Sequence, residues 1–173
     1  MRLFHVSEES DIKIFNQRIP TRVDLDQSVG LVWAINEECL PNFLTPRDCP
    51  RVTYHVGSGT LDSDKERFIT SKNCNHVIIM EDRWLKTIMN TTLYLYEFDP
   101  DEFTLQDEIA GYYVSSTPQV PIGKIVINDL LQELFISNVE VRFVDNLWDI
   151  CNKIKSSSFH WSMCRMGNAT PPK

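Results

Sequence analysis

The sequence lacks a long apolar run: no uninterrupted stretch approaches the roughly 20 residues that a membrane-spanning helix needs. It also lacks the composition of a disordered chain. Of its 173 residues 42% are hydrophobic, and they include nine Phe, five Tyr and four Trp. A chain of this length can bury about 70% of its unfolded surface. We therefore expect one compact domain with its own core.

Basic residues are in deficit. Lys and Arg number 17 against 24 Asp and Glu, which gives a formal net charge of −7. Broad binding to a nucleic-acid backbone needs a basic face, so this balance argues against nucleic acid as a general partner. A local basic pocket for a small phosphorylated ligand stays open, and the sequence does not set the oligomeric state.

Cysteine is sparse and unpatterned. The five cysteines are odd in number and scattered, and no two form a C-x-x-C pair. Residues 1–7 have neither the long apolar segment nor the small-residue cleavage site of a secretory signal. Free thiols are typical of a reducing compartment, so the sequence predicts a cytoplasmic protein.

Several familiar functional motifs are absent. The chain contains no G-x-G-x-x-G, no P-loop, no H-E-x-x-H and no G-x-S-x-G. It also has no internal repeat. The common signatures of dinucleotide-binding enzymes, phosphate-loop proteins, metalloproteases and esterases therefore give no assignment.

Short β-rich runs dominate what is there. The patterns predict strands at residues 3–6, 31–35, 51–56, 76–80, 93–98, 112–115, 122–127 and 139–144. They predict short helices just after Asn36 and at residues 81–89, 129–135 and 147–154, with Asn128 and Asn146 as caps of the last two. Residues 57–64, rich in Gly, Ser and Asp, are expected to form a mobile loop. Strands and helices do not alternate regularly, which favours an α+β domain over residues 1–155, followed by a partly ordered tail at 156–173.

Three segments resemble a family of uncharacterised bacterial proteins known only as a domain of unknown function. They are the opening FHVSEES at residues 4–10, the run VGLVWAI at 29–35, and FLTPRDCPR at 43–51. This resemblance covers most of the chain and implies no activity.

The layout also resembles, more loosely, the ADP-ribosyltransferase fold. The first strand carries His5 and, two positions on, the hydroxyl residue Ser7, and the second strand carries Trp33. The resemblance implies two small, mostly antiparallel sheets around a cleft. In that cleft the histidine would contact the ribose of NAD and the aromatic residue would stack on nicotinamide. From the residues alone, His5 has the alternative of a structural histidine and Trp33 that of a core residue.

The expected catalytic carboxylate is missing. Where the resembled enzymes usually hold a glutamate, this chain has Tyr112 and Tyr113, and the nearest acids are Asp107 and Glu108 on the preceding loop. Without a carboxylate, the oxocarbenium charge of a transferase reaction loses its main electrostatic support. Two functional hypotheses therefore stand. The first is a nucleotide- or NAD-binding protein in which no catalytic residue is assigned, and the second is a non-catalytic binding or interaction module. A carboxylate in the cleft of His5 favours the enzyme, whereas a tyrosine-filled cleft favours the module.

Arginines supply candidate phosphate ligands. Arg18, Arg22, Arg47 and Arg51 could converge on a phosphate, because guanidinium groups suit bidentate contacts. Arginines close to prolines also serve as donors that fix loops by binding backbone carbonyls. We therefore expect a phosphate site only where several of these side chains meet.

A thiol site and a metal site are weaker alternatives. Cys49 lies between two arginines that could lower its pKa, and His55 could act as its base. Nothing in the spacing specifies this pairing, which favours an inert buried cysteine. Metal ligands are available in two groups, Cys74 and His76 with Cys39 or Cys49, and Cys151 with His160 and Cys164. Neither group has zinc-finger spacing, so no metal is expected.

Overall fold

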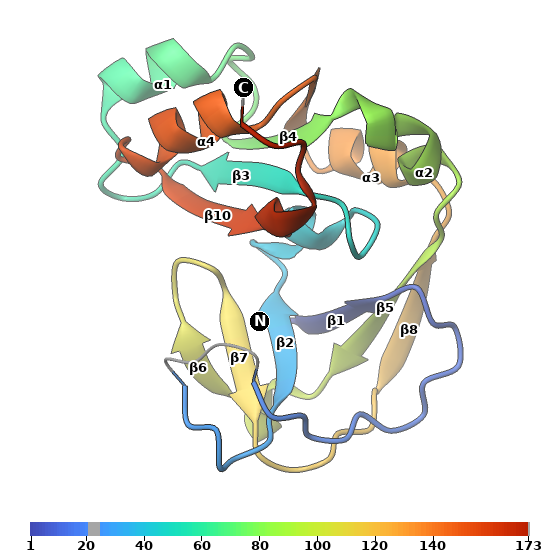
Figure 1. Cartoon of the computed structure of the whole chain (residues 1–173). Helices are drawn as coiled ribbons and strands as arrows, with labels where there is room; N and C mark the ends of the chain where they lie inside the picture. Colours follow the sequence, from blue (N-terminus) through green and yellow to red (C-terminus); the bar gives the residue numbers. More distant parts are fainter. Residues whose placement is uncertain (21–24, 173) are drawn as a thin grey trace. The chain divides into compact units, whose positions relative to one another are not determined.

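A computed structural model describes residues 1–20 and 25–172 of the chain. It divides into two compact units, one formed by residues 1–40 and 93–127 and the other by residues 41–92 and 128–173 (Figure 1). Both units contain a β-sheet, and the four α-helices of the described residues are short. The structure thus confirms an α+β protein with two mostly antiparallel sheets.

Unit 1 is a six-stranded antiparallel sheet. The strands follow the order β6-β7-β2-β1-β5-β8. Their bounds are β1 Leu3–Ser7, β2 Val32–Asn36, β5 Leu93–Phe98, β6 Thr104–Asp107, β7 Tyr112–Ser115 and β8 Gly123–Ile127. Strand β5 ends where Asp99 and Pro100 begin the 3-10 helix Pro100–Glu102.

One face of this sheet carries the core of unit 1. Leu3, Ala34, Tyr96 and Phe98 project from three neighbouring strands, and Phe15 packs on them from the segment after β1. The ring of Phe15 meets those of Tyr96 and Phe98 edge-on, with centroids 5.1 and 5.0 Å away. Alternate residues of LYLYEF in β5 therefore supply a large aromatic core.

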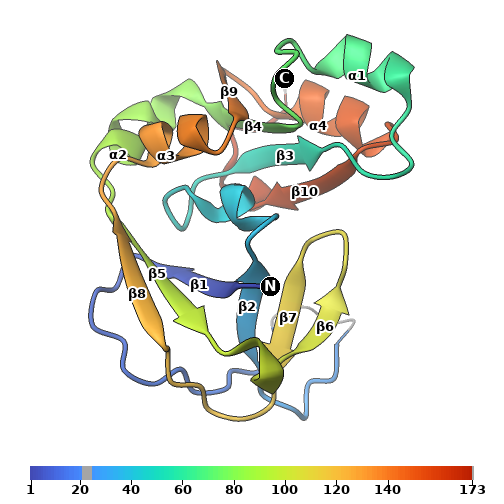
Figure 2. The ribbon, with the colours of Figure 1, turned by 180° about the vertical axis from the view of Figure 1, so that it is seen from behind.

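Unit 2 is a four-stranded sheet with helices (Figure 2). The strand order is β10-β3-β4-β9, and only β4 and β9 run parallel. The strands are β3 Arg51–His55, β4 His76–Glu81, β9 Val139–Val144 and β10 His160–Cys164; the helices are α1 Asp62–Phe68, α2 Leu85–Met89, α3 Leu130–Ile136 and α4 Trp148–Lys155, with 3-10 turns at Leu40–Phe43, Asp82–Trp84 and Met166–Asn168.

The core of unit 2 lies between the sheet and two of its helices. Phe68 of α1 and Leu147, Cys151 and Ile154 from the α4 region pack on Tyr54 and its neighbours on one face of the sheet. Helix α3 packs against β9 and α2. No helix among the described residues is long and apolar enough to cross a membrane.

Three segments differ from the sequence-based expectation. Helix α1 covers part of the predicted loop at residues 57–64, strand β6 was not predicted, and β10 lies in the predicted tail at 156–173. Strand β10 pairs along its whole length with β3, whose own sequence carries no sign of this partner. The boundary expected between residues 155 and 156 therefore falls inside unit 2.

Candidate functional site

The side chain of His5 lies on the aromatic face of the six-stranded sheet. His5 pairs with Tyr96 across β1 and β5, and its Nδ1 atom lies 2.9 Å from the carbonyl oxygen of Trp33 in β2. Its ring is tilted against that of Phe15, with centroids 4.8 Å apart. The half-buried imidazole is therefore fixed by the sheet on one side and by an aromatic ring on the other.

The segment that follows β1 is anchored to the same face. The hydroxyl of Tyr96 donates to the carbonyl of Glu9 at 2.7 Å and accepts from the amide of Ile12 at 3.1 Å. Phe15 exchanges two backbone hydrogen bonds with Gln119 further along. These contacts hold residues 9–15 against the sheet and place Phe15 next to His5.

A second group of polar atoms lies at the end of β1. Ser7 pairs with Tyr94 of β5, and its Oγ accepts the amide of Glu9 at 3.1 Å. The ammonium of Lys124, in β8, lies 5.6 Å from the centroid of the Tyr94 ring and donates to the carbonyl of Ser10 at 2.9 Å. An imidazole, a hydroxyl, a phenol ring and an ammonium thus occupy one face of three consecutive strands. We call His5, Ser7, Tyr94 and Lys124 the β1 corner.

Trp33 projects from the opposite face of the sheet. It neighbours Ala34, which belongs to the aromatic core, so strand alternation directs the indole the other way. The indole meets the ring of Tyr112 edge-on, with centroids 5.3 Å apart. The structure therefore brings His5 and Ser7 together, and the sheet separates both from the indole of Trp33.

The acids preceding β7 are Asp107, the last residue of β6, and Glu108, in the turn between β6 and β7. Glu108 is exposed, and the Oδ1 atom of Asp107 accepts the amide of Ala110 at 3.0 Å. Gly111 closes this turn with a φ of 69°, a conformation that favours glycine. Strand β2 lies between β7 and β1 in the sheet order, so β7 and the turn before it are not adjacent to the strand of His5. The side chains described as pairing with or stacking on His5 are those of Tyr96 and Phe15.

The predicted arginines divide between the two units. In unit 1, Arg18 exchanges two backbone hydrogen bonds with Leu31, just before β2 begins. Arg22 lies outside the described residues. In unit 2, Arg47 is exposed and its carbonyl accepts from Arg165, whereas Arg51 is buried.

The guanidinium of Arg51 binds the backbone of its own unit. Its Nε donates to the carbonyl of Asn42 at 2.6 Å and its Nη1 to that of Cys49 at 2.9 Å. The thiol of Cys49 is fully buried, and burial raises its pKa to about 12 against the smaller opposing effect of Arg51. A thiol of this kind stays protonated at neutral pH, which argues against Cys49 as a nucleophile.

Three of the four histidines form a row across unit 2. His160, His55 and His76 are cross-strand partners on β10, β3 and β4. The centroids of His55 and His76 are 5.2 Å apart, and those of His55 and His160 are 5.4 Å apart. Within residues 1–20 and 25–172, no group of three or more His, Cys, Asp or Glu side chains could hold a metal ion.

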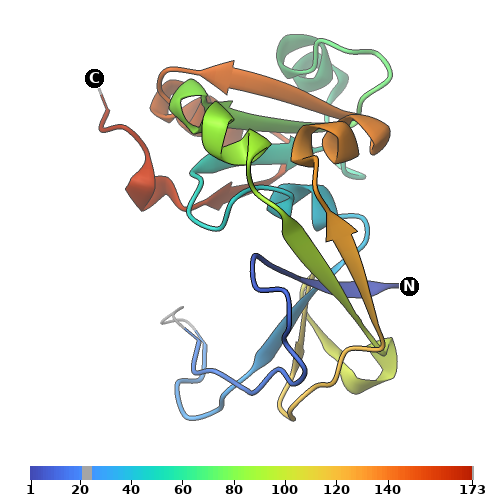
Figure 3. The same ribbon diagram turned by 90° about the vertical axis from the view of Figure 1, so that its right-hand side faces the viewer.

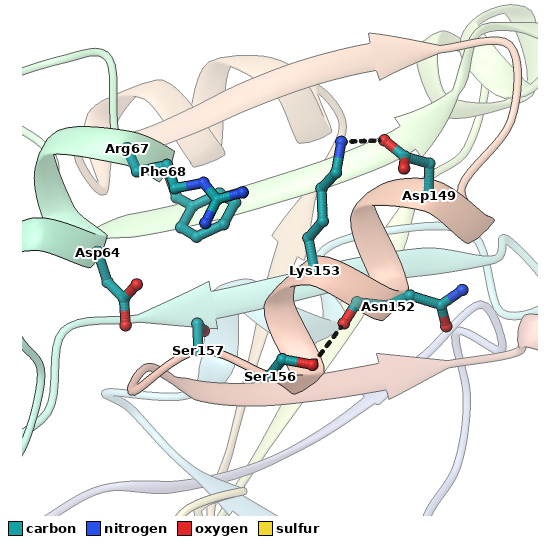
Figure 4. Close-up of a pocket in the computed structure, with 8 residues that line it drawn as sticks. All are labelled: Asp64, Arg67, Phe68, Asp149, Asn152, Lys153, Ser156 and Ser157. Atoms are coloured by element: carbon teal, nitrogen blue, oxygen red, sulfur yellow. Dashed lines mark hydrogen bonds and ion pairs between the residues drawn. The ribbon is translucent and has the colours of Figure 1, made fainter.

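A pocket of about 330 Å³ lies between α1 and α4 (Figure 4). Its charged side chains already have partners in the chain. Lys153 binds Asp149 at 2.6 Å, Arg67 lies over the ring of Phe68, and Asp64 accepts two hydrogen bonds from Ser158. These bonds hold the pKa of Asp64 below its ordinary value. The pocket therefore offers paired charges rather than a site of one sign.

Sequence reasoning selected His5 and Ser7 as candidates but did not select Tyr94 and Lys124, which lie on the same face. Their place beside β1 depends on the register of β1, β5 and β8, which no local pattern specifies.

Among known proteins, residues 4–169 match the model of a family of unknown function (DUF6886). No curated protein and no solved structure matches the chain.

Proposed function

The chain belongs to DUF6886, a family of unknown function, and from its own geometry we propose that it is a binding protein for a nucleotide-class ligand, held at the β1 corner. The observation that carries the proposal is the convergence of His5, Ser7, Tyr94 and Lys124 on one face at the end of β1. These four side chains offer the groups that a nucleotide requires.

Each group has a chemical counterpart in the ligand. The phenol ring of Tyr94 provides a stacking surface for a base, and the hydroxyl of Ser7 provides a polar partner for ribose oxygens. Among the described residues, the ammonium of Lys124 contacts a backbone carbonyl and an aromatic face, so it could turn to a phosphate without breaking a described ion pair. His5 would then face the ribose, as the resemblance to the ADP-ribosyltransferase fold implies.

Transferase chemistry is not part of this proposal. Strand β7 presents Tyr112 and Tyr113 at the place of the expected glutamate, and Glu108 is exposed in the preceding turn. An oxocarbenium-like transition state would lack its carboxylate there. Ligand binding without turnover is the function that these residues support best.

Roles for Trp33, Arg18 and Arg47 in ligand binding stay predictions. The indole of Trp33 lies on the other face of the sheet from His5, so it would belong to a separate contact. Arg51 is excluded from the proposed ligand set because its guanidinium is buried and bound to two carbonyls.

Isothermal titration calorimetry tests the proposal. NAD, ADP-ribose, ADP and adenosine are titrated into the wild type, Lys124→Ala and His5→Gln, with Lys86→Ala on α2 as the control for loss of an exposed lysine. We expect saturable binding of the phosphorylated ligands, weakened about tenfold by Lys124→Ala, because one charge-assisted hydrogen bond contributes about 1.5 kcal/mol.

Adenosine binding should be unchanged in Lys124→Ala, because adenosine has no phosphate. His5→Gln should weaken all four ligands, and Lys86→Ala none. Failure of the folded wild type to bind any of them at about millimolar concentration, where an interaction contributes only about 4 kcal/mol, would overturn the nucleotide proposal. Release of nicotinamide from NAD would overturn the exclusion of chemistry.

A further inference from the structure

Strand β8 ends the six-stranded sheet and exposes apolar side chains on both of its faces. It pairs with β5 only, among the strands that the structure describes (Figure 3). Ile125 and Val126 are adjacent in the strand and so point to opposite faces, and their exposed fractions are 38% and 46%. Ile122, just before the strand, is 67% exposed.

The other edge of the same sheet is protected. Strand β6, with the sequence TLQD, is four residues long and mostly polar, and its pairing with β7 shifts register between Leu105 and Asp107. Short length, polar residues and a bulge are the devices by which proteins prevent pairing at a sheet edge. Strand β8, with the sequence GKIVI, has no bulge and no proline.

A lysine in an edge strand normally discourages pairing as well. Lys124 is the only charged residue of β8, and its ammonium is directed onto its own unit, at the carbonyl of Ser10 and the ring of Tyr94. The outer edge of β8 therefore presents backbone groups and aliphatic side chains rather than charge.

From this contrast we propose that β8 is a self-association edge, at which two copies of the chain pair antiparallel about a two-fold axis through Ile125. Residues opposite each other in an antiparallel pair share a face, so a self-pairing strand must be centred on a residue rather than between two. Centring on Ile125 is the register that pairs all five residues of Gly123–Ile127.

The sequence of β8 favours a second copy as the occupant, because in this register the strand can pair with itself without setting like charges opposite each other. The register sets Ile125 opposite its own equivalent and places Val126 opposite Lys124 of the other copy. The only charge of each strand therefore faces a neutral side chain, and no like charges lie directly opposite each other. Two strands of five residues bury less surface than a standard interface, so the dimer is weak and concentration-dependent.

Sedimentation velocity on the full chain, from about 5 to about 500 μM, measures the association. The wild type should shift from monomer to dimer as concentration rises. Val126→Lys should keep the protein monomeric, since it sets a lysine opposite Lys124 of the partner twice in each dimer. Val126→Thr, which keeps a β-branched side chain, should still dimerise, and Leu105→Lys on β6 should behave as the wild type.

Adding Lys124→Glu to Val126→Lys should restore the dimer, because opposite charges then face each other in the stated register. A wild type that stays monomeric throughout the range overturns the proposal. Dimerisation that Val126→Lys leaves intact, or that Leu105→Lys abolishes, assigns the contact to another surface and overturns it too. Circular dichroism of each variant shows whether a loss of dimer reflects unfolding.

Discussion

The imidazole of His76 faces that of His55 across β4 and β3, with centroids 5.2 Å apart and ring planes 30° apart. The Nε2 atom of His76 also lies 2.7 Å from Oδ1 of Asn42, which identifies this nitrogen as the protonated one of a neutral ring. Burial, and to a smaller extent His55, lowers the pKa of His76 to about 3.

This depressed pKa predicts a loss of stability in mild acid. The unfolded chain binds a proton on His76 near its ordinary pKa of 6.5, whereas the folded chain does so only near 3. The free energy of unfolding should therefore fall as pH falls through 6.5 and continue falling toward 3. Between pH 7 and pH 4.5 this one group accounts for about 2 kcal/mol.

Urea unfolding of the wild type and of His76→Gln at both pH values measures this effect. Glutamine retains an N–H donor for Asn42 but does not titrate, so the variant should lose less stability than the wild type on acidification. Equal losses in the two proteins would show that His76 is not the responsible group.

Glu81 should be essential for the attachment of residues 165–171. Its fully buried carboxylate accepts the amide of Thr170 at 2.7 Å and binds Arg83 at 2.6 Å, and Arg83 donates in turn to the carbonyl of Asn168. Glu81→Ala removes the charged acceptor of the partly buried Thr170 amide, which costs about 2 kcal/mol. Limited proteolysis should then cleave near residue 168 faster than in the wild type.

Glu66→Ala is the matched control for that experiment, because Glu66 is an exposed acid on α1 of the same unit. Its cleavage pattern should be unchanged. Similar protection of the segment in Glu81→Ala and wild type would show that Asn146 and Trp148, which also bind the carbonyl of Thr170, are sufficient.

Replacing Arg51 by methionine should cost much more stability than replacing Arg47 by methionine. Arg51→Met removes two buried donors to the carbonyls of Asn42 and Cys49, and we expect a loss of about 2 to 3 kcal/mol. Arg47 has an exposed side chain, and Arg47→Met should change stability by less than about 0.5 kcal/mol. Chemical denaturation of both variants measures their free energies of unfolding. Similar losses of stability in the two variants would contradict the structural role of Arg51.

Tyr96→Phe should loosen the segment after β1 without disturbing unit 2. The buried Tyr96 hydroxyl bridges Glu9 and Ile12, so its removal should speed hydrogen exchange at the Ile12 amide about tenfold. Tyr54→Phe is the control, since that buried hydroxyl donates to the carbonyl of Phe68 in unit 2. Unchanged exchange at Ile12 in Tyr96→Phe would mean that the remaining contacts, among them the packing of Phe15 and the hydrogen bond from Lys124 to Ser10, are enough to hold the segment.

Local pattern was sufficient for most strands of this fold. The strand-forming run LYLYEF, which Asp99 and Pro100 end, and the alternation of VEVRFV predict β5 and β9 with their observed bounds. Capping side chains were identified less well. Asp129, not Asn128, caps α3 by accepting the amide of Gln132, whereas Asn146 does accept the amide of Trp148 at the start of α4.

Long-range pairing was beyond local pattern. Strand β10 follows three serines and was assigned to a tail, yet its partner β3 lies 109 residues earlier, where Thr53 binds the carbonyl of Ser162. Helix α1 has seven residues and no side-chain cap at Leu61, so it gives no start signal. The separation of His5 from Trp33 also depends on register, here the pairing of Leu3 with Asn36.

The two units alternate along the chain, which constrains both folding during synthesis and the separation of the units by proteolysis. Residues 1–40 belong to unit 1, 41–92 to unit 2, 93–127 to unit 1 again, and the remainder to unit 2. During synthesis, unit 1 cannot close before β8 has emerged, while the β3–β4 hairpin waits still longer for β9 and β10. For the same reason no single cut yields either unit whole, and isolating unit 1 requires joining residue 40 to residue 93 with a new linker.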